Sequence, residues 1–168
     1  MSQDDEAAIK SRMYLYGFAV DSLRWELFDQ IFAAKDLYVR HGERDPWTDL
    51  EKFKNDFATY HRVFDSTQHA MTNMICEIKG DRASTITYAN WRLVRFGAEG
   101  GDTWKGEGWY EDELIRTPQG WRIQRRQSRQ VWREGNDAIG SSTGVKFSHK
   151  TSSLQNSEKA LALKPPIR

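Results

Sequence analysis

The sequence has a single cysteine, Cys76, and four histidines, none of them in a spacing typical of a zinc site. One thiol cannot form an intramolecular disulfide, so we expect a reducing compartment, no structural metal and no cofactor. Apolar runs of about 18 residues are also missing, and the first ten residues are acidic where a secretory signal would be basic. These absences predict a cytoplasmic protein with no membrane segment.

The chain also lacks an excess of charge of either sign. Its 25 Lys and Arg residues balance 24 Asp and Glu residues, so the formal net charge is +1. A chain without an overall basic field has little to attract a polyanion, which argues against nucleic acid as a partner. The balance is not uniform, because the residues from Gly140 onward include five basic side chains and one acidic side chain. The end of the chain is therefore basic and the body acidic.

Aromatic residues, by contrast, are abundant for so polar a chain. They make up 12% of the residues while the mean hydropathy is −0.78, and only Phe147 lies beyond Glu134. A length of 168 residues fits one domain with a modest core. We predict a domain over 1–134 with a small aromatic-lined interior that binds a small molecule. The Ser-, Gly- and Lys-rich residues 135–168 form a basic tail, either flexible or docked on a neighbouring subunit or over the pocket mouth.

Hydrophobic periodicity divides 1–134 into a helical first part and an extended second part. The first part contains apolar residues at helical spacing and side chains suited to helix capping. It predicts a first helix over 3–20, a second that begins after Asp21 and ends before Asp36, and a third from Thr48 or Asp49 to Phe64. A short strand over 37–41 separates the second and third helices. From residue 67 the period is two, and turn residues separate the extended segments. These segments span 67–79, 82–96, 103–117 and 121–133.

This order of elements predicts an α+β fold. About three N-terminal helices would pack on one face of a strongly curved, mostly antiparallel sheet, because long strands twist and curl. A helical layer over such a sheet gives a cone-shaped, barrel-like domain that can enclose a pocket.

Two polar side chains stand at places where chemistry is plausible. Asp21 lies at the junction of the first two predicted helices, where it also fits a helix N-cap. His69 begins the first long strand and shares a face with Met71, Asn73 and Ile75 by the period of two, as a partly polar pocket wall or a solvent-facing edge. If Asp21 and His69 meet, the carboxylate would orient the imidazole and stabilise its charged form after proton abstraction.

Three stretches of the chain resemble the SnoaL-like family of the nuclear transport factor two-like superfamily. They are VDSLRWELFDQIF, HAMTN and GEGWYEDELIRTPQGWRIQRR. The resemblance implies the cone-shaped α+β fold of scytalone dehydratase, bile acid dehydratase and hexachlorocyclohexane dehydrochlorinase. In the dehydratase and dehydrochlorinase branches, an Asp at the first helix junction and a His at the start of the long strand form a catalytic dyad. Asp21 and His69 stand at the corresponding positions.

The resemblance also implies further site residues. Tyr16 stands where some relatives carry a hydrogen-bonding tyrosine, although its place on the apolar stripe equally fits core packing. Among the arginines of the last strand, Arg125, Arg126 and Arg129, the similarity to bile acid dehydratase favours Arg129 as the inward guanidinium that stabilises negative charge. The predicted substrate-binding residues are Asn73, Tyr110, Arg129 and Trp91, and for Tyr110 and Trp91 packing is the alternative.

The resemblance and the residues together predict a cofactor-independent lyase, a dehydratase or another elimination enzyme, acting on a small, largely apolar organic or ring compound. His69 would remove a C–H proton. One alternative is a non-catalytic small subunit of a ring-hydroxylating dioxygenase or a ligand-binding scaffold, and another is an isomerase or polyketide cyclase. The chain has no histidine between His69 and His149, whereas scytalone dehydratase uses a second pocket histidine on a later strand. Outward Trp and Arg on the strands favour a homo-oligomer.

Overall fold

The computed structural model describes residues 3–140 and 158–162. The chain begins with three α-helices, a short 3-10 helix and one short strand, and continues with four long strands. In chain order the elements are α1 (Gln3–Asp21), η1 (Trp25–Leu27), α2 (Phe28–Ile31), β1 (Tyr38–His41), α3 (Leu50–His61), β2 (Ser66–Lys79), β3 (Arg82–Val94), β4 (Thr103–Thr117), β5 (Gly120–Gly135) and α4 (Glu158–Ala162).

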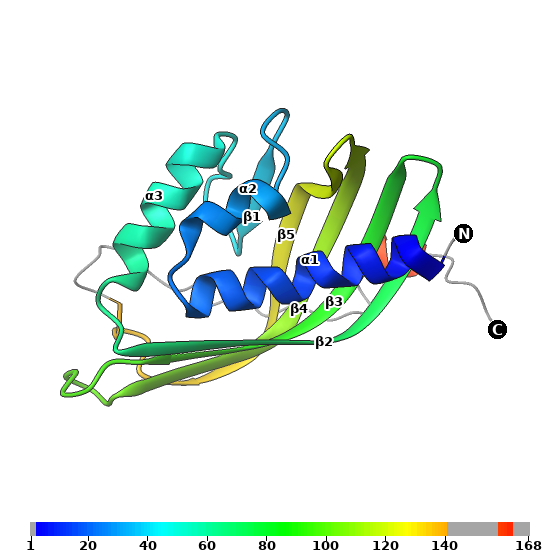
Figure 1. The fold of residues 1–168 in the computed structure, drawn as a ribbon. Helices are drawn as coiled ribbons and strands as arrows, with labels where there is room; N and C mark the ends of the chain where they lie inside the picture. The colour runs from blue at the N-terminus through cyan, green and yellow to red at the C-terminus, as the bar shows by residue number, and fades with distance from the viewer. Residues whose placement is uncertain (1–2, 141–157, 163–168) are drawn as a thin grey trace.

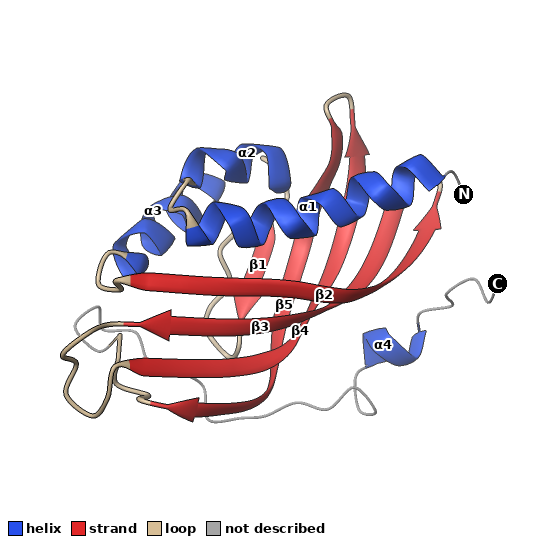
Figure 2. Ribbon diagram, turned by 60° about the horizontal axis from the view of Figure 1, so that its bottom comes forward, coloured by secondary structure: helices blue, strands red, loops and turns tan. Residues whose placement is uncertain are grey.

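The strands form one open sheet in the order β1-β5-β4-β3-β2. All neighbouring pairs are antiparallel except β1 and β5, which run parallel. The sheet curves strongly, and α1, α2 and α3 lie over the same face of it (Figures 1 and 2). The predicted α+β fold with helices on a curved, mostly antiparallel sheet is therefore confirmed.

Helix α1 lies directly against the sheet. Ile9, Met13, Tyr16 and Val20, the apolar stripe seen in the sequence, are fully buried. Gly17 brings the helix close to β2, because a Cβ atom at this position would lie 2.7 Å from the carbonyl oxygen of His69. Glycine at this point therefore sets the end of α1 beside the start of β2.

Helix α3 begins as its sequence predicts. Asp49 is the N-cap, and its carboxylate accepts a hydrogen bond of 2.7 Å from the backbone N–H of Lys52. Such a cap satisfies one of the donors that the first turn of a helix leaves unpaired. The helix then buries Phe53, Phe57 and His61 against the rest of the core.

A β-bulge in β2 changes which side chains face the helices. The register of β2 on β3 shifts between Met71 and Met74, so an extra residue enters the strand at that point. Met74 then takes the inward place, while Asn73 is exposed and Ile75 is 45% exposed. The prediction that Asn73 and Ile75 share a face with His69 is wrong, because a strict period of two does not survive a bulge.

The chain stays packed beyond the predicted domain end at residue 134. Ile139 is fully buried, and the side-chain amide of Asn136 donates hydrogen bonds to the carbonyl oxygens of Glu99 and Gly101. In α4, Lys159 lies 3.3 Å from Glu113 on β4. Most of the predicted basic tail lies outside the described residues. None of the described helices is long and apolar enough to span a membrane.

Candidate functional site

Asp21 and His69 form a hydrogen-bonded pair at the end of α1. Asp21 Oδ1 lies 2.7 Å from His69 Nδ1 and accepts a 2.9 Å hydrogen bond from the hydroxyl of Thr67. Asp21 Oδ2 accepts a 2.7 Å hydrogen bond from the backbone N–H of His69. The same carboxylate thus holds both the backbone and the ring of His69, and the cap of the following helical turn is Arg24, not Asp21.

This geometry sets the state of the imidazole. A carboxylate accepts hydrogen bonds and does not donate them, so Nδ1 of His69 carries the hydrogen and Nε2 has the lone pair when the ring is neutral. The His69 side chain is 8% exposed and that of Asp21 is 27% exposed. A largely buried imidazole whose Nδ1 is bonded to a carboxylate can act as a general base through Nε2.

Two tyrosines lie beside the pair. The ring of Tyr16 is 6.2 Å from the ring of His69 and 5.6 Å from the ring of Tyr110, centroid to centroid. The indole N–H of Trp91 donates a 2.7 Å hydrogen bond to the hydroxyl of Tyr110. Burial raises the pKa of Tyr16 and raises that of Tyr110 well above its ordinary value. Both phenols therefore keep their protons and can donate hydrogen bonds.

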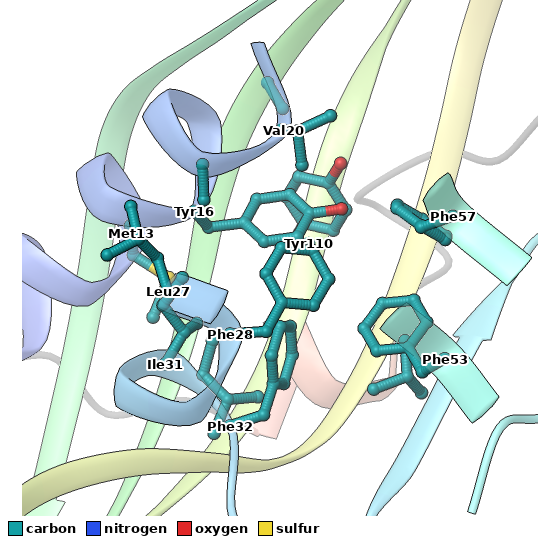
Figure 3. Packing of buried hydrophobic residues seen from close by; sticks show 14 of the residues in the cluster. Met13, Tyr16, Val20, Leu27, Phe28, Ile31, Phe32, Phe53, Phe57 and Tyr110 are labelled. Carbon is teal, nitrogen blue, oxygen red and sulfur yellow. The ribbon is translucent and has the colours of Figure 1, made fainter. Parts of the chain in front are cut away.

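Hydrophobic side chains from the helices pack around these tyrosines. Figure 3 shows Phe28 next to Tyr16 and Tyr110, with Phe53 and Phe57 to its right. The ring centroids of Tyr16 and Phe28 are 5.8 Å apart, and those of Phe28 and Phe57 are 6.0 Å apart. The polar groups of the site therefore lie in a mainly aromatic, low-dielectric surrounding.

A buried ion pair supports the tyrosines from the sheet. Arg126 donates two hydrogen bonds to Asp112, of 2.7 and 2.8 Å, and neither side chain is exposed. The guanidinium carbon lies 4.2 Å from the ring centroids of both Tyr16 and Tyr110. Burial alone would lower the pKa of Arg126, but the charge of Asp112 outweighs it and the pKa is raised. A fixed positive charge thus lies between the two phenols.

Comparison with known families agrees with this fold. The family model described as the SnoaL-like domain matches residues 2–127. The chain belongs to the SnoaL-like domain family. The SnoaL-like chain is 27% identical over 132 residues to an uncharacterized protein of Mycobacterium tuberculosis, covering 73% of this chain and 82% of that protein.

Two solved structures with the same fold carry enzyme names. One is a candidate scytalone dehydratase from Novosphingobium aromaticivorans, with a TM-score of 0.70, 19% identity, and 78% of this chain and 87% of that chain covered. The other is a hexachlorocyclohexane dehydrochlorinase, with a TM-score of 0.68, 17% identity, and 85% and 92% covered. At these identities the similarity establishes the shared fold.

Arg129 lies away from the tyrosines. Its side chain is 43% exposed and pairs with Glu111 at 3.2 Å. Arg126 stands opposite Asp112 in the register of β4 and β5, so the odd-numbered Arg129 points to the other face of the strand. The structure thus replaces Arg129 with Arg126 as the inward guanidinium, because strand parity decides which arginine faces the helices.

Of the other predicted site residues, three lie near the Asp21–His69 pair and one does not. The structure brings Tyr16, Tyr110 and Trp91 together beside the Asp21–His69 pair, whereas Asn73 lies exposed at the bulge.

Sequence reasoning missed two histidines of the SnoaL-like domain. The ring of His61 lies 6.3 Å from that of His69, and the ring of His41 lies 6.2 Å from that of Tyr110. They come from α3 and β1, so no local spacing connects them with His69. The one available signal was the helical stripe of α3, in which His61 follows Phe53 and Phe57. Among the described residues, no group of three His, Cys, Asp or Glu side chains is arranged to hold a metal ion.

His61 makes the stability of the domain depend on pH. Its Nδ1–H donates a 2.8 Å hydrogen bond to the carbonyl of Phe57, and burial lowers its pKa from 6.5 to about 4. Below pH 6.5 the unfolded chain binds a proton at this residue that the folded chain does not, so the free energy of unfolding falls as the pH falls toward 4. The expected slope from this residue is about 1 kcal/mol per pH unit.

Urea denaturation at several pH values would measure this slope. His61→Phe keeps an aromatic ring and removes the titrating group, so the slope between pH 6.5 and 4.5 should decrease. An unchanged slope in His61→Phe would contradict the assignment of acid sensitivity to His61.

Proposed function

We propose that this protein is a lyase that eliminates water or another small leaving group from a small, largely apolar organic or ring compound. The observation that carries the proposal is the Asp21–His69 pair, in which the carboxylate bonds Nδ1 and leaves Nε2 as the base. The enzyme names of solved structures with the same fold, a dehydratase and a dehydrochlorinase, also support an elimination.

In the proposed reaction, His69 Nε2 takes a proton from a carbon next to a carbonyl group. The C–H electron pair moves toward the carbonyl, and negative charge develops on its oxygen. The Tyr16 hydroxyl donates a hydrogen bond to this oxygen, while Asp21 stabilises the positive charge on the imidazole. The electrons then return to form a C=C bond as the bond to the leaving hydroxyl breaks. The proton on His69 Nε2 passes to that hydroxyl, which leaves as water.

Arg126 acts in this scheme through the tyrosines. Its guanidinium lies over the rings of Tyr16 and Tyr110, so a positive charge faces the place where negative charge develops. Because the surroundings are aromatic and buried, this charge is screened less than it would be in water. Arg126 is a positioning residue, and Tyr16 is the group that touches the substrate.

A panel of small β-hydroxy ketones on one-ring and two-ring frames tests the proposal. The wild-type protein should dehydrate at least one member, which is measured as the absorbance of the conjugated enone. Asp21→Asn should lower the rate at least about 10-fold, because it removes the charge that supports the imidazolium. Dehydration that is as fast in Asp21→Asn as in the wild type would contradict the role of the pair. No turnover of any member, together with a stable complex with a larger protein, would favour the scaffold alternative.

A further inference from the structure

His41 ends β1 with one ring nitrogen enclosed in the core. The centroid of its ring is 5.3 Å from that of Phe57, 5.6 Å from that of Trp47 and 6.2 Å from that of Tyr110. Its Nε2 atom is buried and has no hydrogen-bond partner in the described part of the chain. Enclosed polar atoms in proteins are nearly always hydrogen-bonded, so this nitrogen requires an explanation.

The same is true of other polar atoms around Tyr110. Thr87 Oγ1 is also buried without a hydrogen-bond partner among the described residues, and Tyr16 Oη and Arg126 Nη1 make no well-aligned hydrogen bond there, although the Tyr16 hydroxyl interacts with Tyr110 and Arg126. Thr87 pairs with Tyr110 in the register of β3 and β4, and the Arg126 guanidinium lies over the Tyr110 ring. One enclosed nitrogen could be a local defect of packing. Several around one side chain indicate a surface that binds a polar group.

His41 belongs to the same loop of aromatic rings as the proposed base. Six aromatic rings follow one another in a closed loop, and neighbouring centroids in it are between 5.2 and 6.3 Å apart. In order around the loop, the rings are those of His69, His61, Phe57, His41, Tyr110 and Tyr16. His41 is three rings from His69 in either direction, so it stands across the loop from it.

The charge state of His41 restricts what it can bind. Burial lowers its pKa well below the ordinary 6.5, and the positive charges of Arg126 and Arg44, together with His69 and His61 when protonated, act in the same direction. At neutral pH the ring is therefore uncharged. A neutral imidazole can donate or accept a hydrogen bond, which suits an alcohol or carbonyl oxygen better than an anion.

We propose that His41 Nε2 hydrogen-bonds a neutral oxygen of the substrate, across the site from the carbon that loses its proton to His69. This inference rests on the proposed function and adds a specificity determinant to it. If a halogenated or plain hydrocarbon of the same size were bound, His41 Nε2 would be buried without a hydrogen-bond partner. A site with an unpaired buried polar group discriminates strongly against a ligand that leaves it unpaired. His41 thus selects oxygenated compounds.

Binding of three probes of nearly equal size tests this role, namely cyclohexanol, cyclohexanone and chlorocyclohexane. Histidine-labelled protein is followed by ¹⁵N NMR, with His41→Gln used to assign the His41 signals. Cyclohexanol and cyclohexanone should shift His41 Nε2 and bind about 10-fold or more tightly than chlorocyclohexane, which is the order expected for one hydrogen bond. In His41→Phe the three affinities should agree within about 2-fold, while His41→Gln, which keeps a polar group, should retain part of the preference.

Three outcomes would overturn the proposal. The first is chlorocyclohexane binding as tightly as the oxygenated probes, and the second is no His41 shift at the highest soluble concentration of the oxygenated probes. The third is a preference that persists in His41→Phe, whose folding is verified by its thermal transition. None of the probes needs to be turned over, so these outcomes leave the elimination by Asp21 and His69 standing. Conversely, failure of the Asp21→Asn test would remove the elimination and leave the binding preference.

Discussion

Replacement of Asp112 by asparagine is expected to lower the free energy of unfolding by about 3–5 kcal/mol, the range observed when one member of a buried ion pair is removed. The substitution preserves shape but leaves the charge of Arg126 without a counter-ion in a place where neither side chain meets solvent. Domains of this size are stable by about 5–15 kcal/mol in total. Urea denaturation at pH 7.5, where His61 does not titrate, measures the change.

Arg129→Gln is the matched control for this prediction. It breaks the pair with Glu111, which neighbours Asp112 on β4. The Arg129 side chain is 43% exposed, and the buried Glu111 keeps its hydrogen bond from the indole N–H of Trp109, so the cost should be smaller than that of Asp112→Asn. The double variant Asp112→Leu with Arg126→Met removes both charges and should be more stable than Asp112→Asn. If Asp112→Asn costs no more than Arg129→Gln, the pair does not stabilise the core as described.

The second large effect is expected at the proposed base. For any substrate that the panel identifies, His69→Gln should lower kcat by about 10² to 10⁴-fold, the usual contribution of a general base. Glutamine is similar in length and can accept a hydrogen bond, but it cannot take a proton at neutral pH. The measurement is steady-state turnover of wild type and variant, with circular dichroism to verify that the fold is retained.

The Asp21–His69 pair also predicts a non-additive result. If the two side chains act as one unit, Asp21→Asn combined with His69→Gln should be little slower than His69→Gln alone. Arg129→Gln serves again as the control, because Arg129 faces away from the site, and its turnover should equal that of the wild type. Turnover by His69→Gln within a few-fold of the wild type would rule out His69 as the base.

The predicted fold agrees with the structure because its signals are local. The apolar stripe of α1, the Asp49 cap of α3 and the turn residues between the long strands each depend on residues a few positions apart. The same holds for the places of Asp21 and His69 at the ends of α1 and the start of β2. Their pairing was a hypothesis from the family resemblance, and in the structure Asp21 Oδ1 and His69 Nδ1 lie 2.7 Å apart.

Both errors concern which face of a strand a side chain occupies. Asn73 was assigned to the site from the alternation of side chains along a single strand, and Arg129 from the similarity to bile acid dehydratase. A bulge after Met71 and the register of β5 on β4 decide which side chains face the helices, and these depend on the neighbouring strand. His41 and His61 were missed for a related reason, since each is distant in sequence from the residues that it meets.

The sequence by itself determined the order of helices and strands and the placement of most aromatics before Glu134. It also determined that Asp21 stands at the end of the first helix and His69 near the start of the first long strand. Periodicity, capping and turn chemistry act over a few residues, so one chain suffices to read them. Only the tertiary structure decided that Arg126 is the inward arginine, that Asp112 neutralises it, and that His41 and His61 lie in one loop of aromatic rings with His69 and the tyrosines. Strand register and helix packing set these contacts, because they determine which residues distant in sequence share a core.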